Sequence, residues 1–188
     1  MTTQTTSNTL REISDYLKTL DRVAVTTHVG ADGDAIGASA ALVRLMRKLG
    51  AEAVFCHAEA VPGYLRWLLP EDALTELPPG CDLLIVDTSR ADRTGVPIPE
   101  AGARLNLDHH EDNPFYAEYN LVDARAAATA EVVSVCTASW TSRSTRRPRR
   151  PSTLVSRPTR AGSTSATSRR WPTSSSPTCC APGWCRRK

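Results

Sequence analysis

The sequence predicts an α/β fold in which a mostly parallel sheet carries helices on both faces. Short apolar runs, typical of buried strands, alternate along the chain with segments of helical periodicity. Three of these runs end directly before polar residues, at His28, Asp87 and Asp108. Because the carboxyl ends of parallel strands open onto one crevice, we expect these residues to meet at one edge of the sheet.

Each element follows from a local pattern. Apolar residues recur at helical spacing near the N-terminus, and the run before Asp87 is continuously apolar, as in a strand buried on both faces. Helices are predicted for Thr9–Leu20, Ala35–Leu49, the short segment Pro62–Leu69, and Ala126 to about Val135. Strands are predicted for Val23–Thr27, Glu52–Cys56, Asp82–Asp87, Arg104–Leu107 and, at an edge of the sheet, Asn120–Val122.

The formal net charge of +3 conceals two parts of opposite sign. Of the 23 basic residues, 12 lie between Thr141 and Lys188, a segment without Asp or Glu, so the remainder has 11 basic against 20 acidic residues. From position 137 onward the chain is rich in Arg, Ser, Thr and Pro, a composition that cannot bury a core. The sequence therefore predicts a partial N-terminal domain over 1–136, followed by a disordered tail over 137–188.

The expected compartment is the cytoplasm. No apolar run reaches the length of a membrane span, and the N-terminus lacks the basic and apolar regions of a signal peptide. Three cysteines in apolar surroundings are predicted to be small core residues: Cys56, Cys81 and Cys136. The three in the tail have no His beside them and form no convincing zinc pattern: Cys179, Cys180 and Cys185.

A metal site is predicted where the first strand ends. His28, Asp32 and Asp34 fall within seven residues, and Gly33 allows the tight turn that aims both carboxylates at one point. These side chains suit Mn²⁺ or Mg²⁺. The alternative is an acidic, glycine-rich surface loop with an incidental His.

Two ions explain the wider set of polar residues. Asp87 stands alone at a strand end between the other two clusters and is the candidate bridging carboxylate. His28 and Asp32 would complete one ion, and Asp34 with His109 the other. Two ions about 3.5–4 Å apart suit in-line attack of water on a phosphoester.

The neighbouring residues have separate predicted roles. His110 would face the substrate as a phosphate ligand or proton donor, and Asp108 would orient an imidazole. The alternative for Asp87 is a helix N-cap, and for His109 and His110 a pair of surface histidines. His57, the remaining histidine, is predicted to be structural.

Four motifs carry a family resemblance: H-V-G-A-D-G-D-A-I-G-A-S, L-L-I-V-D-T-S, L-D-H-H and A-A-A-T-A-E-V-V. Over roughly Asn8 to Val135 the chain resembles the DHH phosphoesterase superfamily. Within it, the chain most resembles the bacterial NrnA group of bifunctional oligoribonucleases that also dephosphorylate phosphoadenosine phosphate. The pair Gly30-Ala31 is a mild departure, since the family usually has Asn-Pro or a similar pair there.

The resemblance implies a Mn²⁺-dependent phosphoesterase acting on short RNA oligonucleotides (nanoRNA) and 3'-phosphoadenosine 5'-phosphate, with homodimers a candidate assembly for intact relatives. It implies a substrate phosphate contact for His110. It implies two Mn²⁺ ions held by five residues: His28, Asp32, Asp34, Asp87 and His109. The alternatives within the same chemistry are a cyclic dinucleotide phosphodiesterase and a RecJ-like exonuclease. A different alternative is a non-catalytic nucleic-acid-binding protein that uses the basic tail, whose binding would be salt-sensitive.

The resemblance breaks near Ser134. Such enzymes continue with further helices, a D-T-G motif that supplies another metal ligand, and a second domain that grips the nucleotide. Regrouping the codons by a shifted frame permits V-Y-R-L-L-D from 136 onward and D-T-G-R-F over Pro158–Ser163, so the tail is interpreted as a frameshift product. Without that ligand and domain, this chain is expected to show weak or no activity.

Overall fold

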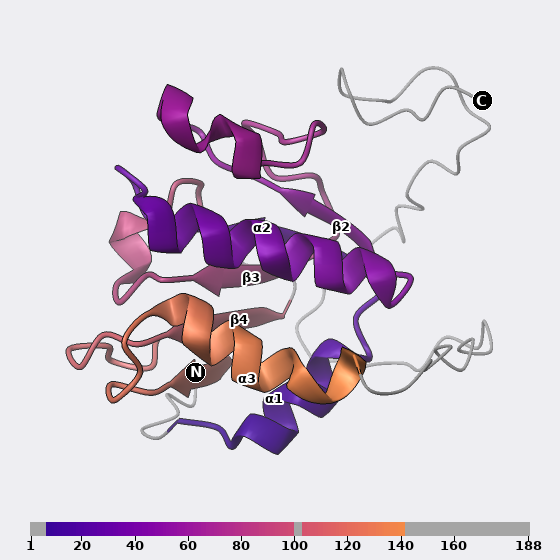
Figure 1. Ribbon diagram of the computed structural model, residues 1–188, viewed down its shortest axis with the longest axis vertical. Helices are drawn as coiled ribbons and strands as arrows, with labels where there is room; N and C mark the ends of the chain where they lie inside the picture. The colour runs from indigo at the N-terminus through magenta and orange to yellow at the C-terminus, as the bar shows by residue number, and fades with distance from the viewer. Residues whose placement is uncertain (1–6, 100–102, 142–188) are drawn as a thin grey trace, which may run out of the picture.

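The computed structural model describes residues 7–99 and 103–141. The prediction of disorder beyond Thr141 lies outside the described residues. Five strands form one sheet in the order β2-β1-β3-β4-β5, and every neighbouring pair is parallel. The strands are β1 (Arg22–Thr26), β2 (Glu52–Phe55), β3 (Asp82–Val86), β4 (Arg104–Asp108) and β5 (Tyr119–Val122). The predicted α/β fold with a parallel sheet is thus confirmed (Figure 1).

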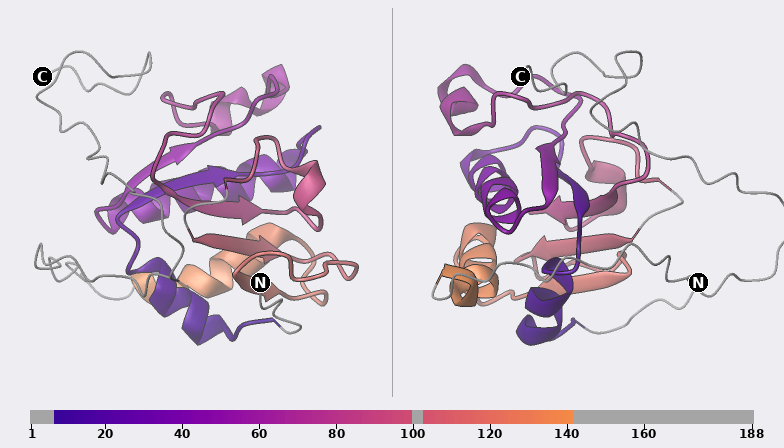
Figure 2. Two further views of the ribbon diagram at one scale, coloured as in Figure 1. Left: turned by 180° about the vertical axis from the view of Figure 1, so that it is seen from behind. Right: turned by 90° about the vertical axis from the view of Figure 1, so that its right-hand side faces the viewer.

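Two apolar clusters cover the two faces of this sheet. The larger cluster joins alternate strand residues to the three α-helices, α1 (Leu10–Leu17), α2 (Gly33–Lys48) and α3 (Thr129–Thr141). The smaller cluster packs the other strand residues against connecting segments, among them the chain that follows the short 3-10 helix η2 (Ala91–Arg93). The sequence predicted helices on both faces of the sheet. In the structure, α2 and α3 lie together on one face (Figure 2), and connecting segments pack on the other.

The last helix differs most from its predicted bounds. It begins at Thr129, three residues later than predicted, because the backbone carbonyl of Ala126 accepts a hydrogen bond from His109 Nδ1. It also continues five residues past the predicted domain boundary at 136. Cys136 and Trp140 are buried in the larger cluster, and Trp140 Nε1 donates to Ser14 Oγ of α1 over 2.9 Å. Trp140, which falls in the expected tail, therefore contributes to the core, and the prediction of disorder is wrong for 137–141.

The remaining elements are close to their predictions. The short helix predicted from Pro62 is the 3-10 helix η1 (Gly63–Leu68), with Pro62 directly before it. All three cysteines predicted to be core residues are buried. Among the described residues, no helix is both long and apolar enough to span a bilayer.

Both outer strands of the sheet have covered edges. Along β5, Asn8 N–H donates to Asn120 O over 2.6 Å, and Val122 N–H donates to Ser7 Oγ over 3.0 Å. At β2, Leu74 forms a bridge with Cys56 directly after the strand, and its N–H donates to Phe55 O over 2.8 Å. Segments from outside the sheet thereby bond to backbone groups along β5 and at the end of β2.

Candidate metal centre

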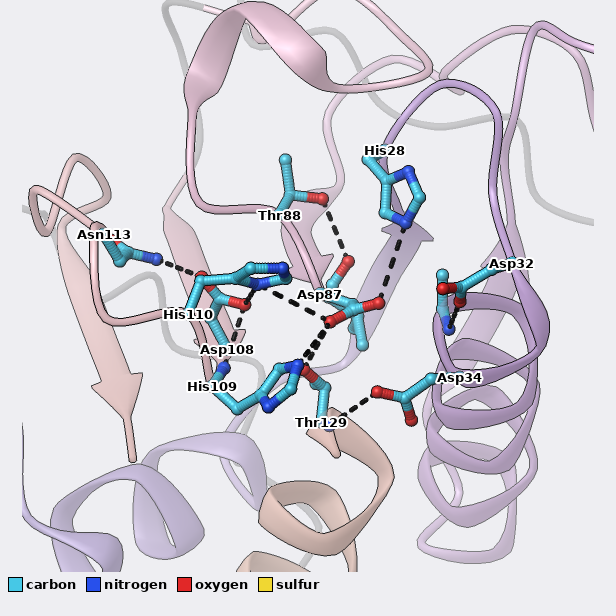
Figure 3. Close-up of polar contacts among 12 residues, drawn as sticks. His28, Asp32, Asp34, Asp87, Thr88, Asp108, His109, His110, Asn113 and Thr129 are labelled. Atoms are coloured by element: carbon cyan, nitrogen blue, oxygen red, sulfur yellow. Dashed lines mark hydrogen bonds and ion pairs between the residues drawn. The ribbon is translucent and has the colours of Figure 1, made fainter. Parts of the chain in front are cut away.

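The predicted convergence of strand ends is present. Strands β1, β3 and β4 are parallel neighbours, so the residues at their carboxyl ends lie at one edge of the sheet. His28 follows β1, Asp87 follows β3, and Asp108 ends β4. Their side chains and those of the two residues after Asp108 surround one point, with Asp87 at the centre (Figure 3). The helices α2 and α3 begin beside it.

Asp87 is the buried centre of this cluster. Its side chain is 4% exposed, and its φ of +55° turns the chain out of the sheet at a value that Asp tolerates better than most residues. Its N–H still donates to Leu107 O over 2.9 Å, and its Oδ1 accepts from Thr129 Oγ1 over 2.6 Å. Burial, together with the negative charges of Asp34 and Asp108, raises its pKa. A cation beside this carboxylate would remove that electrostatic cost.

Two imidazoles flank Asp87, one at each oxygen. His28 Nε2 lies 3.7 Å from Oδ2, and His109 Nε2 lies 3.7 Å from Oδ1. The other ring nitrogen of each is engaged by a backbone carbonyl, His28 Nδ1 by Val29 O at 2.8 Å and His109 Nδ1 by Ala126 O at 3.2 Å. A carbonyl only accepts, so in the neutral rings Nδ1 carries the proton and the Nε2 lone pair faces the carboxylate. This is the arrangement of a metal-ligating histidine.

The spacing of these atoms fits cations. Ligand atoms of His28, Asp32 and Asp87 lie within 4.8 Å of one another, and so do those of Asp87, His109 and His110. Ligands about 2.1 Å from a small divalent ion can be up to about 4.2 Å apart, so the 3.7 Å separations are compatible with an ion between them. Asp87 belongs to both groups, which is the geometry expected of a bridging carboxylate.

The two aspartates of the loop after β1 also hold helices. Asp32 is the N-cap of α2, where its Oδ1 accepts from Ala35 N–H over 3.0 Å. Asp34 accepts from the first N–H groups of α3, with 2.7 Å from Thr129 N to Oδ2 and 2.9 Å from Ala130 N to Oδ1. Asp34, unlike Asp32, lies in neither group of potential ligands within the described chain. Each of its oxygens retains a further lone pair.

His110 is held by the fully buried Asp108. Its Nδ1 lies 2.7 Å from Asp108 Oδ1, and Asn113 Nδ2 donates to Asp108 Oδ2. Burial opposes the charged ring, but the hydrogen bond to Asp108 and the carboxylates nearby raise the pKa of His110. Asp108, for which an orienting role was predicted, is thus in direct contact with the His110 ring. His110 Nδ1 is also 3.8 Å from Asp87 Oδ1.

Sequence reasoning missed Thr129 and Asn113 as parts of this site. Thr129 joins the bridging candidate Asp87 to α3, and Asn113 links Asp108 to Asn106, with 2.7 Å from Asn113 Nδ2 to Asn106 Oδ1. The signal for Thr129 was its place as the single polar residue after three alanines, where a helix could begin. Asn113 carried no signal beyond its nearness to the D-H-H triplet.

Comparison with known proteins identifies relatives of this chain. The family model for the DHH family, N-terminal domain, matches residues 22–155. The protein "Bifunctional oligoribonuclease and PAP phosphatase NrnA" of Thermus thermophilus is 37% identical over 129 residues, which cover 66% of this chain and 39% of that relative. The chain therefore spans well under half the length of this relative.

Solved structures agree on the fold. An exopolyphosphatase-related protein from Bacteroides fragilis superposes with a TM-score of 0.59, covering 69% of this chain and 43% of that one at 18% sequence identity. At such a low identity, the structural likeness shows the fold alone. The family match, in contrast, spans more than half of the chain and shows the family. This protein belongs to the DHH family.

Proposed function

We propose that the cluster around Asp87 is a two-metal phosphoesterase site that prefers Mn²⁺ and also accepts Mg²⁺. The observation that carries this proposal is the pair of imidazoles on Asp87, each with Nε2 directed at a different carboxylate oxygen. A buried carboxylate with a raised pKa and two oriented nitrogen lone pairs is a donor set suited to divalent cations. Bound ions would activate water and neutralise the leaving oxygen.

The protein residues divide between two ions. His28 and Asp32 would hold one ion, and His109 with Asp34 the other, while Asp87 would bridge them. Asp34 stays in the proposal because both of its oxygens keep a lone pair after accepting from α3. The caps formed by Asp32 and Asp34 fix both carboxylates to helix ends and reduce the reorganisation that ion binding requires.

His110 would act on the phosphate. The hydrogen bond to Asp108 raises the pKa of His110, which favours its role as a proton donor to a phosphate or leaving oxygen. Asp108 is buried and accepts from His110 through Oδ1 and from Asn113 through Oδ2, so it orients the ring without contacting substrate.

The proposed substrates are short RNA oligonucleotides and 3'-phosphoadenosine 5'-phosphate. The support is the 37% identity to the Thermus protein, whose name includes both activities. Because the match covers 39% of that relative, we propose weak or no turnover by this 188-residue chain, with the substrate-gripping residues contributed elsewhere in longer relatives. Efficient Mn²⁺-dependent hydrolysis of a dinucleotide by this chain would contradict the expected weakness.

The test of the site is Mn²⁺ binding. Calorimetric titration of the full chain should give two ions per chain, and Asp87→Asn should lose both, because the bridge is removed. Asp92→Asn is the matched control: Asp92 is an exposed carboxylate paired with Arg90 at 2.7 Å. The control should bind as the parent chain does. If the parent chain binds no Mn²⁺, or if Asp87→Asn binds it equally well, the proposal is wrong.

A further inference from the structure

His57 lies buried against the backbone of a proposed metal ligand. It follows β2, is 4% exposed, and its Nε2 lies 2.9 Å from the carbonyl oxygen of His28. That carbonyl can only accept, so Nε2 carries the proton and donates. Nδ1 lies 3.2 Å from both the nitrogen and the carbonyl oxygen of Glu59, and the N–H can donate to it in the neutral ring. The shorter contact to His28 O makes Nε2 the donor nitrogen on that side of the ring.

Gly95 leaves the space that this ring fills. A Cβ added at Gly95 would meet the His57 ring, at 2.5 Å from Nε2, a separation that real Cβ atoms do not show. Gly95 N–H donates to Thr27 O over 2.8 Å, and Ala58 N–H donates to Gly95 O over 2.9 Å. His57 is therefore enclosed between the ends of two loops, and its donor nitrogen sits where only glycine allows it.

The same contacts fix the loop that carries His28. Val29 N–H donates to Arg93 O over 2.8 Å, and Gly30 N–H donates to the Glu59 carboxylate over 2.7 Å. The carbonyl of Val29 in turn accepts from His28 Nδ1, which leaves Nε2 to face Asp87. A shift of the peptide between His28 and Val29 would therefore change the direction of the ligand lone pair.

We infer that His57 is a positioning residue for His28, acting through the backbone carbonyl of His28 and allowed by Gly95. The inference rests on the proposed metal site and adds a residue outside its ligand set. Among the described residues, no hydrogen bond or ion pair joins His57 to the side chain of Asp87 or Asp32, so its effect on an ion would be transmitted by the loop. Partners that orient metal ligands typically contribute about 10–100-fold to metal affinity.

The experiment compares Mn²⁺ affinity with metal-free thermal stability in the full chain. His57→Phe keeps a ring but removes the donor, and His57→Gln keeps an amide donor near the position of Nε2. Ser14→Ala is the matched control, because it removes the acceptor of a buried hydrogen bond from Trp140 in the helical layer. We expect His57→Phe to weaken Mn²⁺ binding by about 10-fold or more, His57→Gln to restore most of it, and Ser14→Ala to lower stability alone.

The outcomes separate the inference from the function on which it rests. Absence of Mn²⁺ binding in the parent chain would reject the metal site, and the inference with it. Normal Mn²⁺ affinity in a folded His57→Phe variant would reject the inference alone. If that variant does not fold, Gly95→Ala gives a second answer: it should weaken Mn²⁺ binding in the parent but change little when added to His57→Ala. Equal effects in both backgrounds would overturn the inference.

Discussion

The carboxylates on the α2 side of the candidate metal centre are held by helix N-termini, whereas the imidazoles on the β4 side are held through Nδ1. Asp32 and Asp34 accept backbone N–H groups at the starts of α2 and α3. His109 and His110 meet a backbone carbonyl and a buried carboxylate, respectively. The carboxylates therefore take part in the architecture of the fold, while the free Nε2 atom of His109 makes no protein hydrogen bond among those described.

This difference separates two properties that a single substitution usually mixes. A carboxylate on the α2 side should contribute to both stability and metal binding, since it caps a helix and offers a lone pair. An imidazole on the β4 side should contribute mainly to metal binding, because neither His109 nor His110 caps a helix: His109 Nδ1 bonds only to Ala126 O, in the segment before α3. The following predictions test that separation.

The largest expected effect comes from His109→Ala and Asp34→Ala. Both should abolish binding of the second Mn²⁺ ion, but only Asp34→Ala should also lower the free energy of unfolding, by about 1 kcal/mol, because it removes the cap of α3. Asp34→Asn is the intermediate variant: its single amide oxygen can accept only one of the two N–H groups, so it should recover part of the lost stability without restoring metal binding. Calorimetry and denaturant unfolding measure the two properties. Equal destabilisation by His109→Ala would break the comparison.

A smaller effect is expected on the titration of His110. Asp108→Asn should lower the pKa of His110 toward its ordinary value, because it removes the acceptor charge that favours the imidazolium ion. A raised pKa in the folded state adds stability at acidic pH, which is lost as the pH rises through that pKa, so this contribution should disappear in the variant. NMR titration of the metal-free chain measures the pKa.

Asp112→Asn provides the control for this titration. Asp112 acts on His110 through charge alone and is the weakest of the causes that raise its pKa. Its replacement should therefore shift the pKa less than Asp108→Asn does. A larger shift in the control would mean that the charge of Asp112, and not Asp108, is the main cause of the raised pKa of His110.

The smallest effect on the site is expected from deleting 142–188. The proposed ligands on both sides of the centre precede this segment, so Mn²⁺ affinity and the unfolding midpoint should stay close to those of the full chain. The deleted segment holds 11 Arg and 1 Lys without acidic residues, so salt-sensitive binding of single-stranded RNA should fall. Loss of Mn²⁺ binding would instead place part of the site in the tail.

The coding DNA tests the origin of that tail. Translation of codons 132 to 190 in all frames should give V-Y-R-L-L-D and D-T-G-R-F in the shifted frame. If no frame contains these segments, the frameshift interpretation is rejected.

Local patterns in the sequence were sufficient for the sheet and for most of the cluster. Short apolar runs in the sequence indicated the strands. The positions of His28, Asp87 and Asp108 could be predicted because each of these residues follows such a run. Parallel pairing then brings them together, because the carboxyl ends of neighbouring strands lie at one edge. The spatial proximity of these residues thus followed from secondary structure alone.

Long-range contacts were not accessible in the same way. The partner of Asp34 is the backbone of Thr129, 95 positions later, and no local pattern shows that α3 begins beside it. His57 was predicted to be structural, and its burial agrees, but its bond to His28 O depends on how two loops pack. The predicted start of α3 was wrong for a similar reason. Alanine content favours a helix from Ala126, but the carbonyl of Ala126 accepts a hydrogen bond from His109, which is distant in the sequence.

The covered edges of the sheet bear on how this protein meets other chains. An open outer strand would present unpaired N–H and C=O groups to any extended peptide, and this is a common origin of aggregation. Here Ser7 and Asn8 already bond to β5, and Leu74 continues the pairing at the end of β2. A second copy of the chain could not extend the sheet at β5 without first displacing its own N-terminal segment. Self-association by strand addition at that edge is thereby disfavoured.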